Sequence, residues 1–353
     1  MWQLDNRTPF AAERTWVRDR NGAEIWLVAV KCTFDIKPNG TTEIAAEQPP
    51  VTMAPEYLGE PAKSSLKYDS DLRLTKKTTD ILLHGQAYAP KGYLAKTVDV
   101  GLRVGPVIKV LKVYGDRYWN PENGLPYSEP KPFSKMPIVY ERAFGGVDPV
   151  LKGDEPGSWD WRNPIGTGFA TSSSHLSGVR LPNIEYPDAL IQSRSDRPAP
   201  AGFGPICSHW QPRVRYAGTY DDHWLQTRMP LYPEDFDERF FQCAPADQQA
   251  PTFLRGGEPV ALRGLSPEGD IRFHLPRLFL GFETFFYDGE RRLHEPPKLH
   301  SVILEPDFPR VSLVFHTALP CHPKVRKLRE TRIYEKQPIG TREASADAAE
   351  EVF

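Results

Sequence analysis

The sequence has few cysteines, no excess of either charge and no long hydrophobic run. Its four cysteines are far apart in 353 residues, which excludes the disulfide framework of a small secreted protein. Lysine and arginine number 44 against 46 aspartates and glutamates, so charge gives no general reason to expect nucleic acid or an anionic membrane as a partner. No apolar run approaches ~18 residues. Residues 1–10 carry no basic segment followed by an apolar stretch, so we expect a cytoplasmic protein without a signal peptide or membrane span.

Proline, by contrast, is abundant. The 36 prolines are spread along the whole chain, at roughly twice the ~5% background. Proline lacks a backbone N–H and fixes φ, so it interrupts helices and central strands. The chain also holds 8 tryptophans, 14 tyrosines and 18 phenylalanines, which is the composition of a folded protein. We therefore predict a mainly β fold in which short strands are joined by ordered loops.

Two regions, 1–119 and 256–336, have the pattern of antiparallel strands. Asn21-Gly22 lies between two extended runs, the strongest short-range hairpin signal. Gly105-Pro106 breaks an alternating run that then resumes, which predicts a second hairpin. From residue 26 to residue 36 every even position is apolar, and the odd positions become polar from Lys31 onward, which is typical of a strand with one face on a core. Cys32 belongs to the apolar face and is expected to be a buried small hydrophobe. We predict antiparallel sheets, in a sandwich or barrel-like arrangement, with the two regions packed together.

The middle region, 120–255, has weak strand patterns and is rich in proline, glycine and tryptophan. Its aromatic residues recur every few positions, which favours long ordered loops over a flexible linker. Short helical turns are expected at 222–228 and 233–240, the second because it begins with proline and two acids. Residues 337–353 are acidic and alanine-rich, and we expect a loose tail there. The same pattern is compatible with one continuous domain.

The stretch "AGFGPICSHWQPR", residues 201–213, contains the most suggestive pair of reactive side chains. Cys207 and His209 stand two apart, and a cysteine nucleophile would need its thiolate activated by such an imidazole. No known nucleophile signature surrounds them, and Pro205 and Pro212 indicate a rigid loop. We predict a structural loop or a recognition surface here, and no catalytic residue.

The spacing of the other reactive side chains argues against metal, phosphate or glycosidic chemistry. No C-x-x-C or H-x-x-x-H pair exists. The glycine turns at 166–169 and 202–205 lack the lysine of a phosphate-binding loop, and the acids of 221–238 stand where turns and helix starts are capped. We predict no metal and no cofactor. The side chains that could otherwise be combined into a zinc site are Cys207, His209, His223 and Cys243, or His316, Cys321 and His322.

Tryptophans are concentrated in the loop-rich middle region. They have two interpretations: they hold the loops against the β regions, or they form a recognition surface, since aromatic side chains in loops often supply binding energy. For a partner-binding surface the best candidates are Trp159, Trp161, Trp210 and Trp224.

Several long strings resemble one bacterial family over residues from about 15 to about 335, among them "KTTDILLHGQAYAP" (77–90), "PIVYERAFGG" (137–146) and "PAGFGPICSHWQPR" (200–213). The family is the type VI secretion accessory proteins catalogued as domain of unknown function family 2169. The resemblance implies a cytoplasmic chaperone or adaptor that stabilises an effector with a PAAR-like tip domain and helps to load it on the VgrG spike. The effector is then the first candidate partner of this protein, and the VgrG spike is the second. It implies no catalytic residues. The alternative hypothesis is an enzyme or carbohydrate-binding module that uses the aromatic, acid-rich middle region.

Overall fold

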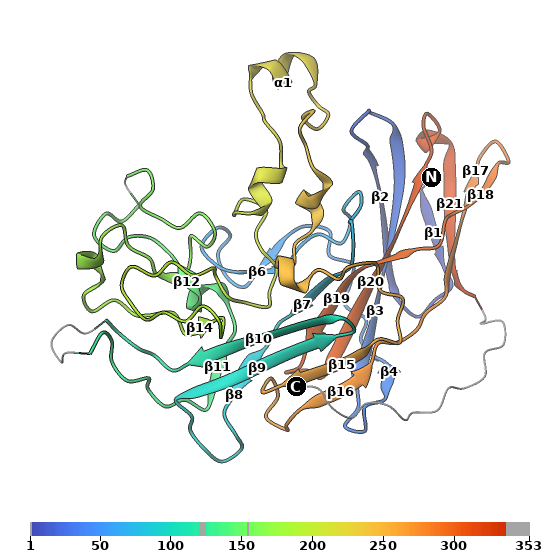
Figure 1. The fold of residues 1–353 in the computed structure, drawn as a ribbon. Coiled ribbons are helices and arrows are strands. Elements are labelled where there is room, and N and C mark those ends of the chain that lie inside the picture. The colour runs from blue at the N-terminus through green and yellow to red at the C-terminus, as the bar shows by residue number, and fades with distance from the viewer. Residues whose placement is uncertain (1, 120–124, 154, 337–353) are drawn as a thin grey trace.

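The computed structural model describes residues 2–119, 125–153 and 155–336. The fold is mainly β, with 37% of residues in strands and 8% in helices, which confirms the predicted fold class. Three large sheets and three two-stranded pairs are joined by long loops, and the described strands close no barrel (Figure 1). None of the helices in the described ranges is long and apolar enough to cross a membrane.

The largest sheet has six strands in the order β2-β3-β20-β19-β7, with β4 paired to the far end of β3. The predicted turn at Asn21-Gly22 joins β2 to β3, and Gly22 has the positive φ of 86° that favours glycine. Strand β7 runs parallel to β19, so the sheet is mixed. Its strands are β2 (Ala11–Arg18), β3 (Glu24–Ile36), β4 (Thr42–Ile44), β7 (Asp80–Leu83), β19 (Lys298–Glu305) and β20 (Arg310–Pro320).

The second sheet has five strands in the order β14-β10-β9-β15-β16. Its centre is the predicted hairpin around Gly105-Pro106, in which β9 and β10 pair along their whole length. Strand β9 also pairs with β15, which comes from the C-terminal region. The strands are β9 (Thr97–Val104), β10 (Val107–Tyr114), β14 (Ile184–Glu185), β15 (Pro259–Arg263) and β16 (Ile271–His274).

The third sheet has four strands in the order β1-β21-β17-β18, with β1 parallel to β21. All three large sheets thus combine strands from regions 1–119 and 256–336. The predicted tail, 337–353, lies outside the described residues. The strands are β1 (Gln3–Asn6), β17 (Leu280–Phe286), β18 (Arg291–Leu293) and β21 (Leu328–Glu335), and the small pairs are β5 (Glu56–Tyr57) with β6 (Leu66–Tyr68), β8 (Gln86–Tyr88) with β11 (Lys135–Pro137) and β12 (Phe144–Gly145) with β13 (Thr167–Gly168).

One hydrophobic core joins the three large sheets. The even residues of β3 supply Trp26, Val28, Val30 and Cys32, each with no exposed surface, as the alternation predicts. Side chains from the other sheets complete the same cluster, among them Val100, Leu102, Leu262, Phe282 and Ile333. Burial of this apolar area is the main favourable term of folding.

The second face of the six-stranded sheet is buried as well, which the alternation in β3 does not predict. Lys31 is 4% exposed and Thr33 has no exposed surface, although both lie on the polar face of the strand. On the same face of the neighbouring strands, Ser312 of β20 and Ser301 of β19 are also buried. The loops of residues 45–80 and 236–250 cover this face, so its polar groups must find partners inside the protein.

Helices are short and lie mostly in the middle region. The expected turn at 222–228 is α1 (Asp222–Thr227), which Asp221 caps by accepting a hydrogen bond from the Trp224 N–H at 2.9 Å. Helix α1 lies at the tip of an arm that projects from the body of the protein (Figure 1). The turn expected at 233–240 begins further along the chain, as η5 (Glu238–Phe241), because Asp237 caps that segment. The other 3-10 turns are η2 (Tyr140–Arg142), η3 (Ser173–Leu176), η4 (Arg213–Tyr216), η6 (Ala246–Gln248) and η7 (Val325–Lys327).

Candidate functional site

The loop of residues 201–213 does not pair Cys207 with His209. Cys207 is 1% exposed, and burial raises the pKa of its thiol to about 12, so the thiol is protonated at neutral pH. His209 is exposed, and within the described ranges its ring makes no hydrogen bond with the thiol. The geometry therefore supplies no thiolate and no activating base.

The same loop is instead held rigidly from both sides. Trp210 is 1% exposed and packs edge-on against Tyr140, with ring centroids 5.6 Å apart. Arg213, buried at the end of the loop, donates to the carbonyl of Ile206 at 2.6 Å and to the carboxylate of Asp69 at 2.8 Å. This loop is therefore an architectural element.

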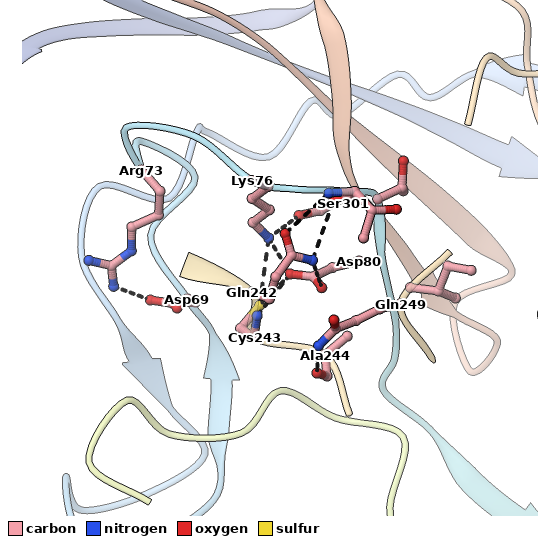
Figure 2. Close-up of polar contacts among 12 residues, drawn as sticks. Asp69, Arg73, Lys76, Asp80, Gln242, Cys243, Ala244, Gln249 and Ser301 are labelled. Atoms are coloured by element: carbon pink, nitrogen blue, oxygen red, sulfur yellow. Dashed lines mark hydrogen bonds and ion pairs between the residues drawn. The ribbon is translucent and has the colours of Figure 1, made fainter. Parts of the chain in front are cut away.

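A buried ion pair lies where the middle region meets the second face of the six-stranded sheet (Figure 2). Lys76 Nζ donates to Asp80 Oδ2 at 2.5 Å, and the side chains are 5% and 0% exposed. Lys76 Nζ also donates to Ser301 Oγ of β19 at 3.0 Å. Burial, the largest single effect, lowers the pKa of Lys76, but the charge and hydrogen bond of Asp80 together with other acidic groups nearby outweigh burial and raise the pKa above the ordinary lysine value. Lys76 therefore carries its charge inside the protein.

Asp80 also binds the loop that covers the sheet. Its Oδ2 accepts a hydrogen bond from the backbone N–H of Cys243 at 2.9 Å, and its Oδ1 accepts from Gln242 Nε2 at 2.8 Å (Figure 2). Gln242 in turn accepts from the N–H of Lys77 at 2.8 Å. One carboxylate thus connects β7, the loop before it and a loop more than 160 residues away in sequence. We call the four residues Lys76, Asp80, Gln242 and Cys243 the anchor cluster.

A second buried lysine, Lys109 of β10, holds the middle region from the five-stranded sheet. It is 4% exposed and its Nζ donates to the Gly202 carbonyl at 2.7 Å, to Gln248 Oε1 at 2.8 Å and to Asp247 Oδ1 at 3.0 Å. Burial lowers the pKa of Lys109 to about 8, against the opposing effect of Asp247. Residues 202 and 247–248 are therefore fixed by one ammonium group.

The anchor cluster contains groups that occur in active sites, but its atoms are occupied by one another. Both oxygens of Asp80 accept hydrogen bonds from the protein, and burial raises the pKa of the Cys243 thiol to about 12. No group of three or more His, Cys, Asp or Glu side chains within the described ranges is arranged to hold a metal ion. The cluster is therefore best explained as the support of the loops above it.

The four predicted partner-binding tryptophans lie in three different environments. Trp159 and Trp161 contact each other with ring centroids 4.9 Å apart, and Trp161 is 55% exposed. Trp210, within the loop of residues 201–213, is buried, so in this structure a partner has no access to it. Trp224 lies on the arm, where its Nε1 donates to the Leu231 carbonyl at 2.8 Å. A surface role stays a prediction for the three that are accessible.

A groove of about 540 Å³ separates the arm from the edge strand β2. Trp16, from the strand, and Trp224, from the arm, both line it. The arm is tied to the β2–β3 turn by Arg228, which donates to the Arg20 carbonyl at 2.6 Å. Three large apolar side chains of the arm face solvent at more than half of their surface: Tyr220 at 55%, Leu225 at 54% and Met229 at 59%. We call residues 219–232 together with this groove the arm surface.

The sequence analysis missed both the anchor cluster and the contribution of Trp16 to the groove. The buried Lys109 was missed as well, although it shares a face of β10 with the apolar Val107, Leu111 and Val113. Asp80 directly precedes the apolar run Ile81–Leu83, which places a carboxylate at the start of a buried strand. No local pattern connects either residue with Gln242 or Gln248.

Comparison with known proteins identifies a family for this chain but no relative of known activity. The model of a family described as "Uncharacterized protein conserved in bacteria (DUF2169)" matches residues 21–316. No curated protein and no solved structure matches the chain. The matched residues include most strands of the three sheets, the anchor cluster and residues 219–232 of the arm, but not the residues of β2 that line the groove.

Removing the carboxylate of Asp80 is expected to destabilise the fold strongly. The Asp80→Ala variant leaves the ammonium of Lys76 buried without a counter-ion, and breaking a buried pair from one side costs about 3–5 kcal/mol. The double variant Lys76→Met/Asp80→Leu removes both charges and should recover part of this loss. Urea denaturation gives the free energy of unfolding for each variant.

The matched control is an ion pair on the surface. Lys91 and Glu268 lie 3.6 Å apart with side chains 81% and 80% exposed, so Glu268→Ala should leave stability nearly unchanged. An Asp80→Ala protein as stable as the Glu268→Ala protein would contradict the structural role of the anchor cluster.

Acid is expected to destabilise the fold through its buried histidines. His300 and His316 stack with ring centroids 4.4 Å apart, each 3% exposed, and burial lowers the pKa of His316 to about 3 and that of His300 well below its ordinary value. The unfolded chain takes up these protons near pH ~6.5. Stability is therefore full above that pH and falls below it, by up to about 1.4 kcal/mol per pH unit for each histidine.

Urea denaturation between about pH 6.5 and about pH 5 measures this slope before most carboxylates titrate. The His316→Leu variant should show a shallower slope. His274→Leu, at an exposed position of β16, should keep the slope of the wild type. A free energy of unfolding that stays constant over this range in the wild type would refute the prediction.

Proposed function

The chain belongs to the DUF2169 family of uncharacterized bacterial proteins, and from this premise we propose that it is a chaperone or adaptor of type VI secretion. In this proposal it binds an effector with a PAAR-like tip domain in the bacterial cytoplasm, stabilises it and helps to load it on the VgrG spike. It acts by binding, without a reaction of its own. The resemblance of the strings at 77–90, 137–146 and 200–213 supplies the biological context.

The observation that carries the proposal is the arm surface. Tyrosine, tryptophan and methionine are enriched in protein interfaces; on the arm, Tyr220 and Trp224 line the groove and the neighbouring Met229 is exposed. The exposed Leu225 extends this apolar surface to the tip of the arm. Exposed apolar patches of this kind are typical of docking surfaces.

The rigidity of the loops supports the same proposal. Surfaces that are ordered before binding lose less conformational entropy when a partner docks. The arm begins directly after η4, where Arg213 bonds to Asp69, and ends before η5 and the anchor cluster. Both bases of the arm are therefore fixed to the body of the protein by buried polar contacts.

A chaperone of this kind is expected to control the amount of its effector in the cell. Binding to the folded effector stabilises it by RT ln(1 + [L]/Kd), about 2.7 kcal/mol at a hundredfold excess over Kd. Native domains hold only ~5–15 kcal/mol in total, so an effector without this protein should be depleted by proteolysis. The measurement is the level of the effector encoded beside the gene, co-expressed with the wild type, with no adaptor and with variants of this protein.

Three substitutions test the arm surface and its neighbourhood. Leu225→Asp and Trp224→Ala should weaken effector binding about 30-fold, the effect of losing ~2 kcal/mol at an interface hot spot, and Trp161→Ala tests the separate exposed pair. The matched control is Tyr93→Asp, a change of a 74% exposed aromatic side chain in the loop between β8 and β9. Effector levels that do not depend on this protein would end the proposal. Levels that depend on it but ignore the arm variants would move the binding surface elsewhere.

A further inference from the structure

A second cavity, separate from the arm, lies at the edge where the parallel strands β7 and β19 both end. Its volume is about 300 Å³, and its walls come from five segments of the chain: residues 58–67, 84–85, 138–140, 202–204 and 305–310. Three of these segments belong to the strings on which the family resemblance depends, at 77–90, 137–146 and 200–213. The family strings thus meet at this cavity.

The charged groups in the wall neutralise one another. Glu305 accepts a hydrogen bond from Tyr68 Oη at 2.6 Å and one from Arg310 Nε at 2.7 Å. Asp307 accepts from Tyr88 Oη at 2.7 Å. The two acids of the wall, Glu305 and Asp307, are matched in number by two cations, Arg310 and Lys67, so the wall has no net charge and a neutral occupant fits it best.

An imidazole in the wall has no hydrogen-bond partner among the described residues. His84 lines the cavity, and neither nitrogen of its ring makes a hydrogen bond with another described residue. Its Nε2 is fully buried, and the ring packs edge-on against Tyr68 with centroids 5.1 Å apart. Burial lowers the pKa of His84 to about 4, so the ring is neutral at pH 7 and carries one donor and one acceptor nitrogen. A hydroxyl group can pair with an imidazole nitrogen that faces the cavity whether or not that nitrogen carries the proton, because a hydroxyl both donates and accepts.

The rest of the cavity suits an aromatic ring. Phe308 and Leu58 form an apolar lip and are 67% and 50% exposed. On the inner side, Gly202 and Gly204 present backbone instead of side chains, and no atom lies within 4 Å of the position where a Cβ of Gly204 would stand. An aromatic side chain with an apolar body and a polar tip matches this combination of an apolar entrance and an unpaired imidazole.

We propose that this cavity binds a phenolic group, namely the side chain of a tyrosine that the bound effector presents. The phenol ring packs between the apolar lip and the glycine backbone, and its hydroxyl bonds to the imidazole of His84. The assignment to a protein partner rests on the proposed function, whereas the chemistry of the cavity does not.

The probe for the cavity is p-cresol, the side chain of tyrosine as a free molecule, compared with toluene, which lacks the hydroxyl. Ligand-observed NMR titration of the purified full-length protein should give a Kd on the order of 1 mM for p-cresol, and binding about tenfold weaker for toluene. In His84→Phe the two probes should bind equally, because the ring is kept and the nitrogens are lost. The matched control His274→Phe, at an exposed position of β16, should behave as the wild type.

These results decide the chemistry of the cavity. Failure of p-cresol to bind, equal binding of toluene to the wild type, or a preference that survives in His84→Phe would each overturn the proposal. Retained folding of His84→Phe, checked by its thermal unfolding, is expected because the buried Nε2 has no partner to lose.

A second experiment tests whether the phenol comes from a partner protein. Gly204→Leu fills open space in the wall, and it should weaken capture of the co-expressed effector about tenfold or more while the fold is retained. Equal capture by wild type and Gly204→Leu, with p-cresol still bound by the wild type, would overturn the partner tyrosine in favour of a small phenolic ligand. An effector that fails to bind even the wild type would end the proposed function and the partner assignment together, and the p-cresol result would stand by itself.

Discussion

The charge of Lys76 must be neutralised inside the protein, and much of the architecture follows from this requirement. An ammonium group without a counter-ion in a buried site costs several kcal/mol, so Lys76 and Asp80 have to stay together. Asp80 is the first residue of β7, and the same carboxylate binds the backbone of Cys243 and the side chain of Gln242. The loop of residues 236–250 is thereby fixed to the sheet. Without it, the second face of the sheet would lose its cover.

Buried cations repeat this arrangement at other places in the molecule. Lys31 on β3 donates to Thr52 at 3.1 Å, Lys109 on β10 binds residues 202 and 247–248, and Arg213 holds the loop of residues 201–213 against Asp69. Each connects a regular element or a rigid turn with a loop that has no regular structure of its own. Long loops are thus ordered by polar contacts under them, and the arm projects from a rigid base. This is the physical link between the interior of the protein and a surface that binds a partner.

Much of the fold follows from local sequence signals, because hairpins depend on neighbouring residues. Asn21-Gly22 and Gly105-Pro106 stand at the turns that they predict, and Cys32 lies in the core. The burial of Lys31 and Thr33 could not be predicted in this way, because the loops that cover them come from elsewhere in the chain. The same reason explains the tryptophans: Trp210 and Trp224 have similar loop contexts, yet one is buried and the other lines a groove. Alternation describes which residues share a face of a strand, and it contains no information on what covers that face.

Native-state hydrogen exchange tests the central claim that the buried polar contacts make the middle region one cooperative unit with the sheets. The amides of Cys243 and Gln248, in the covering loop of residues 236–250, bond to Asp80 and to the Pro245 carbonyl. If the claim is correct, they exchange with the same free energy of opening as the amides of β3 and β20, whereas the amides of the arm, 219–232, exchange earlier. Exchange of residues 236–250 at a much lower free energy than the sheet, while the sheet stays protected, would contradict the account.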